Sequence, residues 1–170
     1  RQAERFLDLG GGAGSYAIAL ARRYPTLQGL VIDQSVTVAK RLIRRERLAN
    51  RIQVQEGDLR TLPLPTDLDV VLLANVLHDF NKTENRHLLR RTRKALRPGG
   101  RLFIVEYFLA REETRPAEAA VFSLLMFAFT GTGRCYSWNE VEAWLRQAGF
   151  GRCRRHKVTG SIGTLEATKL

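Results

Sequence analysis

Cysteine, methionine and long apolar runs are scarce in this sequence. Its 170 residues include two cysteines and one methionine. Cys135 and Cys153 are far apart and belong neither to a paired metal-ligand spacing nor to a disulfide framework, so we expect no bound metal and a reducing, cytoplasmic setting. No apolar stretch approaches the roughly 20 residues of a membrane span, and no signal-like leader opens the chain. These absences predict a soluble domain without membrane contact.

Acidic residues are also few relative to basic ones. The chain has 17 Asp and Glu against 28 Lys and Arg, which gives a formal net charge of +11 at pH 7. Such an excess can indicate binding to nucleic acid or to an acidic surface, and it can also reflect the hydrated outer sides of amphipathic helices. We favour the hydrated helix faces for the basic clusters, which are Arg41, Arg44, Arg45 and Arg47; Arg90, Arg91, Arg93 and Lys94; and Arg152, Arg154, Arg155 and Lys157.

Apolar runs and helical patterns alternate along most of the chain. They predict strands at residues 5–9, 27–32, 52–55, 68–74 and 101–105, helices at 15–23, 36–48 and 81–96, and a final hairpin of strands at 152–158 and 163–169. This alternation indicates an α/β, doubly wound (Rossmann-like) fold with a mostly parallel seven-stranded sheet and a C-terminal antiparallel hairpin. Ligands of such folds bind at the carboxyl ends of the strands.

The C-terminal third departs from the alternation. Residues 117–129 form a predicted helix that is apolar nearly all round, so we expect it to be buried. Ser137 and Glu140 form a capping-box pattern that predicts another helix, which runs to Gln147. We find no internal linker and expect one domain over residues 1–170. Because the chain begins with Arg1 and a strand follows at once, we interpret it as a piece of a longer polypeptide.

A glycine-rich segment, "FLDLGGGAGSY" at residues 6–16, lies between the first strand and the first helix. Gly10, Gly12 and Gly14 predict close backbone contact with a nucleotide-like ligand, but Ser15 stands where the dinucleotide fingerprint has its third small residue. Asp8 would repel a pyrophosphate and would attract an ammonium group. S-adenosylmethionine has an ammonium group, a cationic sulfonium and no phosphate, so we predict that it binds here. The structural alternative is a tight helix-packing turn.

Two further acidic residues follow the second and third strands. Asp33 lies about 20 residues beyond the glycines and is placed to accept the ribose hydroxyls. Asp58 is placed to accept a hydrogen bond from the adenine amino group, and Leu59 is placed to pack against the adenine ring. Each aspartate alone could instead be a helix cap or a turn residue. Three acidic residues that close three successive strands, together with the glycines, favour the cofactor site.

Five segments, in this order, carry a resemblance to a known family: "LDLGGGAG", "GDL", "LHDF", "LRPGGRLFIVE" and "AGF". Over practically its whole length the chain resembles the catalytic domain of the S-adenosylmethionine-dependent small-molecule O-methyltransferases of plant phenolic and bacterial antibiotic pathways. The resemblance implies the class I methyltransferase fold, methylation of a hydroxyl on a small aromatic or polycyclic natural product, and S-adenosylhomocysteine as product. It also implies an N-terminal helical domain and a homodimer for the full-length protein.

His78 of "LHDF" follows the fourth strand, at the cofactor edge of the predicted sheet. A neutral imidazole suits the removal of a hydroxyl proton as the methyl group arrives. The resemblance implies this general-base role for His78, with the carboxylates of Glu106 and Glu140 beside it. Two structural alternatives stay open. His78 could cap the next helix or hydrogen-bond in the core, and Glu140 could serve only the capping box.

Helical spacing groups Phe122, Met126 and Phe129 on the predicted apolar helix, which by default indicates core packing. The resemblance implies instead that this helix forms part of the pocket for the methyl acceptor. Aromatic and apolar walls suit an aromatic or polycyclic acceptor. We assign Asp79, which follows His78, to the same substrate pocket.

The sequence also departs from the family pattern. Phe80 replaces the usual Trp, and "RCYS" replaces the more usual "ERT" before Glu140. These changes leave a carbon-methylating relative, an RNA methyltransferase and an inactive cofactor-binding module as alternatives. After the fourth strand the chain has "ANVLHDF", where nucleic-acid methyltransferases have an Asn/Asp-Pro-Pro-aromatic or a Pro-Cys loop, and this difference disfavours nucleic acid as a partner.

Overall fold

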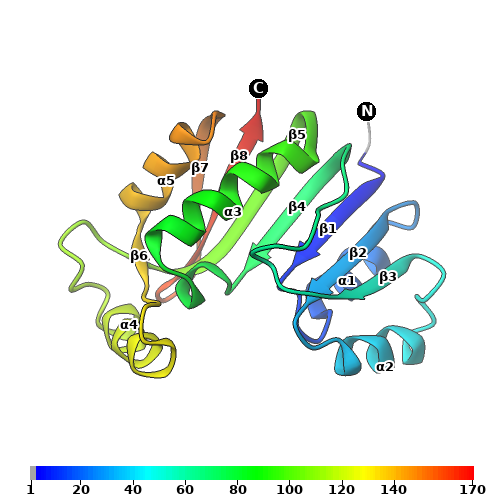
Figure 1. The fold of residues 1–170 in the computed structure, drawn as a ribbon, viewed down its shortest axis with the longest axis horizontal. Coiled ribbons are helices and arrows are strands. Elements are labelled where there is room, and N and C mark those ends of the chain that lie inside the picture. Colours follow the sequence, from blue (N-terminus) through cyan, green and yellow to red (C-terminus); the bar gives the residue numbers. More distant parts are fainter. Residues whose placement is uncertain (1–2) are drawn as a thin grey trace.

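A computed structural model describes residues 3–170 of the chain, and Arg1, on which the fragment interpretation depends, lies outside the described residues. The elements in chain order are β1 (Arg5–Leu9), α1 (Ser15–Arg23), β2 (Gln28–Asp33), α2 (Thr37–Arg45), β3 (Ile52–Glu56), β4 (Leu68–Ala74), the 3-10 turn η1 (Leu77–Asp79), α3 (Lys82–Ala95), β5 (Leu96–Leu109), α4 (Ala117–Thr130), β6 (Tyr136–Ser137), α5 (Trp138–Gln147), β7 (Phe150–Thr159) and β8 (Ile162–Lys169). Figure 1 shows their arrangement around one twisted sheet.

The strand order of the sheet is β3-β2-β1-β4-β5-β8-β7, and the short strand β6 pairs with β5 off this path. β1 to β5 are parallel to one another, whereas β8 runs antiparallel to both β5 and β7. The predicted α/β fold with a mostly parallel sheet and a C-terminal hairpin is therefore confirmed; the seven predicted strands form the main path, and β6 is an eighth strand that was not predicted. β5 is longer than predicted, because its pairing with β8 continues from Arg101 to Tyr107.

Apolar side chains on both faces of the sheet form two cores. Successive residues of a strand point to opposite faces. Accordingly Phe6 packs with residues of α1 and α2, whereas its neighbour Leu7 packs with residues of α3 and α5. Figure 1 shows α3 and α5 in front of the sheet and α1 behind it. The nearly continuous apolar run of β4 fits a central strand with neighbours on both faces, whereas β3 at the edge of the sheet alternates apolar and polar residues.

The face that carries α1 is partly open further along the sheet. An apolar groove of about 560 Å³ lies between α1 and strands β4 and β5. Tyr16 and Tyr24 of α1 form one side, and each is 44% exposed. Val70 of β4 and Phe103 of β5 form the other side. The chain therefore exposes a concave apolar surface on the side of the sheet opposite α3.

Helix α4 differs most from the sequence-based prediction. Ala119 is its buried residue, whereas Leu124 is 73% and Phe129 is 77% exposed. The prediction that this helix is buried is therefore wrong for the described part of the chain. The helix is apolar nearly all round, and one side of it contacts the end of β5, the turn η1 and Cys135, whereas Leu124 and Phe129 face away from these neighbours.

Candidate active site

The predicted glycine turn connects β1 to α1. Gly10 and Gly12 have φ values of 78° and 53°, in the left-handed region that favours glycine. A Cβ atom at Gly10 would lie 2.5 Å from Cγ2 of Val76, whereas a Cβ at Gly12 would meet no described atom within 4 Å. Gly10 therefore allows close approach of the segment after β4, and Gly12 presents bare backbone to open space. Gly14 is the N-cap residue of α1.

Asp8 lies beneath this turn and is fully buried. A Cβ at Gly11 would lie 2.7 Å from its carboxyl group, so the turn rests directly on it. Neither carboxyl oxygen has a hydrogen-bond partner among residues 3–170. Burial raises the pKa of Asp8 to about 6; the nearby N–H of Ala17, although it is not placed well enough to form a hydrogen bond, lowers the pKa by less, and the charge of Asp33 adds to the increase. Asp8 thus contacts the underside of the turn rather than the open cleft.

Asp33 at the end of β2 is bonded to the same turn. Its Oδ2 atom accepts a hydrogen bond from the backbone N–H of Gly12 at 2.8 Å, and Oδ1 accepts one from the N–H of Ser35 at 3.1 Å. Each carboxylate oxygen offers two acceptor sites. Both oxygens can therefore still accept the paired hydroxyls of a ribose.

A cleft of about 530 Å³ opens beside the turn, at the carboxyl ends of the parallel strands. It brings together four of the predicted residues, Gly10, Asp33, Leu59 and Asp79. Asp58 lies instead at an adjoining open depression, where Oδ1 and Oδ2 bind Nε and Nη2 of Arg60 at 3.0 and 2.8 Å. The cleft has the position and size of a site for a nucleoside-containing ligand.

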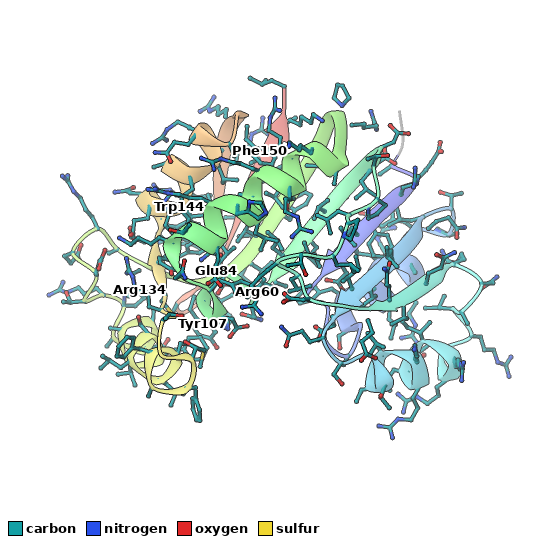
Figure 2. All side chains as sticks on the ribbon, viewed as in Figure 1. Arg60, Glu84, Tyr107, Arg134, Trp144 and Phe150 are labelled. Atoms are coloured by element: carbon teal, nitrogen blue, oxygen red, sulfur yellow. The ribbon has the colours of Figure 1, made fainter. Side chains whose placement is uncertain are left out.

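Sequence analysis missed Arg60 and Glu84, which also line the cleft. Arg60 follows "GDL" directly, and its only sequence signal is an opposite charge two positions from Asp58. Glu84 belongs to the capping box that starts α3, a structural role that conceals its second contact with Arg60. Figure 2 labels these two side chains next to each other near the start of α3.

His78 and Glu106 form a buried pair beside the cleft. Nδ1 of His78 lies 2.8 Å from Oε2 of Glu106, and the two residues are 7% and 3% exposed. The other oxygen of Glu106 accepts the backbone N–H groups of Val76 and Leu77 at 2.8 and 2.7 Å. Glu106 lies within β5 rather than closing it, contrary to prediction, and its carboxylate anchors the start of the turn that carries His78.

This pairing defines the protonation of the imidazole. A carboxylate at Nδ1 assigns the proton to that nitrogen and leaves the lone pair on Nε2. Burial by itself lowers the pKa of His78, but the hydrogen bond and charge of Glu106, with the charge of Asp79, outweigh it and raise the pKa above its usual 6.5. Nε2 lies 3.8 Å from Oδ1 of Asp79. The carboxylate of Glu106 therefore fixes the orientation of the imidazole, and in the neutral ring Nε2 is the nitrogen that can accept a proton.

Helix α4 brings one of its three predicted pocket residues into contact with His78. The ring of Phe122 packs edge-on against the ring of His78, with centroids 5.0 Å apart, and also contacts Tyr107 at 4.5 Å. Met126 is half-buried, and Phe129 is exposed. The structure therefore joins Phe122 to the His78 site and leaves Phe129 outside it.

Glu140 occupies the predicted capping box at the start of α5. Its Oε2 accepts the N–H of Ser137 at 3.1 Å, and Oε1 lies 2.7 Å from Arg134 and 3.1 Å from Lys82. Burial alone raises the pKa of Glu140, but these partners outweigh it and lower the pKa. The described contacts of Glu140 do not include His78, so the structure places Glu140 at a helix cap and not beside the imidazole.

Cys135 lies in the packed region next to His78 and Glu106. Burial, and then the charge of Glu106, raise the pKa of its thiol to about 12, so the thiol stays protonated and is not a nucleophile. Among residues 3–170, no group of three His, Cys, Asp or Glu side chains could hold a metal ion. None of the described helices combines the length and the apolar character needed to cross a bilayer.

Comparison with known proteins places the chain among methyltransferases. A family profile described as an O-methyltransferase domain matches residues 1–151. A 3-hydroxy-5-methyl-1-naphthoate 3-O-methyltransferase of Streptomyces sahachiroi is 35% identical over 169 residues, which are 97% of this chain and 49% of that protein. An L-tyrosine C(3)-methyltransferase of Streptomyces lavendulae is 35% identical over 149 residues, 86% of this chain and 41% of that protein.

A solved structure agrees with these sequence matches. The crystal structure of human N-acetylserotonin methyltransferase in complex with S-adenosylmethionine superposes with a TM-score of 0.86 at 31% identity, covering 98% of this chain and 48% of that chain. The chain spans about half the length of the curated relatives it matches. Because the family profile covers most of the chain and the fold agrees, the chain belongs to the O-methyltransferase family.

Proposed function

We propose that this domain transfers a methyl group from S-adenosylmethionine to a hydroxyl group of a small aromatic or polycyclic molecule. The observation that carries the proposal is the buried His78–Glu106 pair, which occupies Nδ1 and leaves Nε2 directed toward Asp79, a residue that lines the cleft. Membership of the O-methyltransferase family supports the same reaction. We propose that the whole protein is cytoplasmic and forms a homodimer. Light scattering of the full-length chain tests the dimer by measuring its molar mass.

The residues around the cleft fit this cofactor. The bare backbone at Gly12 allows close approach of the amino-acid part, Asp33 retains acceptors for the ribose hydroxyls, and Leu59 offers an apolar surface for adenine. When bound, the cofactor would supply a methyl group on a cationic sulfur. The acceptor oxygen would bond to the methyl carbon as the bond between that carbon and the sulfur breaks, and the sulfur would keep the electron pair. Asp8 is buried directly beneath the turn, and in this proposal its carboxyl group attracts the ligand's ammonium group across the turn rather than by direct contact in the cleft.

His78 acts as the general base in this proposal. Nε2 takes the hydroxyl proton while the oxygen attacks, and Glu106 holds the Nδ1–H and stabilises the imidazolium that forms. Phe122 lies against the imidazole and provides an aromatic wall for the acceptor next to the base. The protein otherwise aligns the two reactants, which is the larger part of catalysis for a direct displacement.

Replacement of His78 by Ala tests the proposal in the full-length protein. We expect binding of S-adenosylhomocysteine, measured by titration calorimetry, to be retained and O-methylation to fall by a factor of about 100 or more. His156→Ala is the control, because His156 is exposed on β7 and pairs with Glu166 far from the cleft. Unchanged methylation in His78→Ala would show that His78 is not the base.

Carbon methylation is a second candidate, supported by the match to the L-tyrosine C(3)-methyltransferase. An activated aromatic carbon can accept the methyl group from the same position that a hydroxyl oxygen would take. His78 would then remove the ring proton or orient a neighbouring hydroxyl. Nuclear magnetic resonance of the product distinguishes the two candidates, since a methyl group on oxygen and one on carbon have different chemical shifts.

A further inference from the structure

We propose that Arg60 is a cofactor-binding residue whose guanidinium plane covers the adenine ring at the rim of the cleft. The inference rests on the proposed function, because it requires a ligand that contains adenosine. Arg60 follows Leu59, which is 6% exposed and lies within contact distance of Gly10. The backbone therefore passes from the cleft floor to its rim at this point.

Arg60 lies where a planar ligand would leave the cleft. Its side chain is 51% exposed and lines both the cleft and the adjoining depression. The side chain thus lies between the cleft, which Leu59 also lines, and the open depression beside Asp58. An arginine at such a rim can stack on a purine ring, since the guanidinium is flat and weakly hydrated.

Two carboxylates, those of Asp58 and Glu84, hold the guanidinium of Arg60 in place. Nε and Nη2 of Arg60 bind the two oxygens of Asp58, and the backbone N–H of Arg60 donates to Oδ1 of Asp58 at 2.8 Å. On the opposite edge, Nη1 lies 3.6 Å from Oε1 of Glu84 on α3. Glu84 is itself fixed, because its Oε2 accepts the N–H of Asn81 at 2.9 Å. A two-bond carboxylate pair of this kind sets the plane as well as the position.

The two carboxylates also solve an electrostatic problem. The proposed ligand carries a net positive charge, so an unpaired arginine beside it would repel it. The hydrogen bond from Arg60 lowers the pKa of Asp58, so that carboxylate stays ionised and neutralises the guanidinium. Asp58 is then a positioning residue that holds Arg60 flat, rather than a direct partner of the adenine amino group as the sequence suggests.

Titration calorimetry with S-adenosylhomocysteine tests the proposal in the full-length protein. Arg60→Ala and Arg60→Lys should each raise the Kd about fivefold, because both remove the flat surface. Arg60→Phe should keep the Kd within about twofold of the parent, since a phenyl ring also stacks on adenine. Arg155→Ala is the matched control: it removes a similar pair, with Nε and Nη2 of Arg155 at 2.6 and 2.8 Å from Glu142, at the other edge of the sheet.

The outcomes separate this inference from the proposed function. If Arg60→Lys keeps the affinity and Arg60→Phe loses it, charge and not the plane binds the ligand, and the inference is wrong. If Asp33→Ala weakens binding and no Arg60 variant does, the cofactor site stands and Arg60 has no part in it. If the parent protein does not bind S-adenosylhomocysteine, both proposals fail. Circular dichroism melting curves confirm that each variant is folded.

Discussion

Nδ1 of His78 is bound to Glu106, whereas Nε2 has only the more distant charge of Asp79 beside it, so we expect the titration of His78 to be visible in the reaction. A general base acts in its neutral form, so kcat/KM should rise with pH and level off above the raised pKa of His78. Glu106→Gln removes the charge that opposes the effect of burial, and the midpoint should move to lower pH while kcat falls. A pH–rate profile of both proteins checks this. A midpoint that does not move would contradict the role of Glu106.

Asp8 titrates differently from an ordinary surface carboxyl. Its pKa is about 6 in the fold against an ordinary 3.8, so the folded chain holds the proton more tightly than the unfolded chain does. The free energy of unfolding should therefore fall as the pH rises from about 4 through 6, by about 3 kcal/mol in all. Asp8→Asn cannot ionise. The difference in stability between variant and parent should grow in this pH range and stay constant above it.

Urea unfolding at several pH values, without ligand, measures this difference. The shape of the difference curve is decisive, because a buried amide also changes stability by an amount that does not depend on pH. Parallel curves for the two proteins would mean that Asp8 does not titrate in this range. A rising curve would show that the fold accepts an unfavourable charge beneath the glycine turn.

Single residues differ in how well the sequence predicts them. The glycines, Asp33 and His78 were recognisable because each follows a parallel strand, and such strand ends share one edge of a sheet. The burial of Asp8 was not predictable, since it depends on the turn folding back over the strand. The contact of Arg60 with Glu84 joins a loop to a helix far along the chain, and no local pattern encodes such a pair.

At the scale of elements, variants at the start of α5 can distinguish a helix-capping role of Glu140 from a catalytic one. If its role is the helix cap, Ser137→Ala and Glu140→Ala should each lower the free energy of unfolding by about 1 kcal/mol and leave kcat nearly unchanged. Urea unfolding and turnover rates of the two variants check this expectation. Loss of turnover in Glu140→Ala alone, with stability unchanged, would support the catalytic role that the family resemblance implies.

The elements themselves were predicted well where the apolar pattern is strong. The parallel strands and the first three helices lie within a few residues of their predicted positions, because each pattern reflects burial against a neighbour in the same chain. Helix α4 lies where it was predicted, but the prediction that it is buried was wrong, and the reason is also physical. Its pattern records the need for an apolar neighbour, but a pattern does not state whether the described chain provides that neighbour.

For the molecule as a whole, α4 lies outside both cores, and its substitutions should reflect that position. Leu124→Gln and Phe129→Ser should change the free energy of unfolding by less than about 0.5 kcal/mol, because these side chains are exposed. Leu89→Ala, in the core under α3, should cost about 2 to 5 kcal/mol. Thermal or urea unfolding compares the three variants. A large loss in either α4 variant would show that the helix is packed in solution.

The open groove between α1 and β4 has a practical consequence for work with this chain in isolation. In dilute buffer the charge of +11 keeps molecules apart by mutual repulsion. Added sulfate screens that repulsion and also strengthens the association of apolar surfaces, so both effects favour association of the chains. We therefore expect salting-out at unusually low ammonium sulfate, and retention on phenyl resin where a protein this cationic would ordinarily pass through.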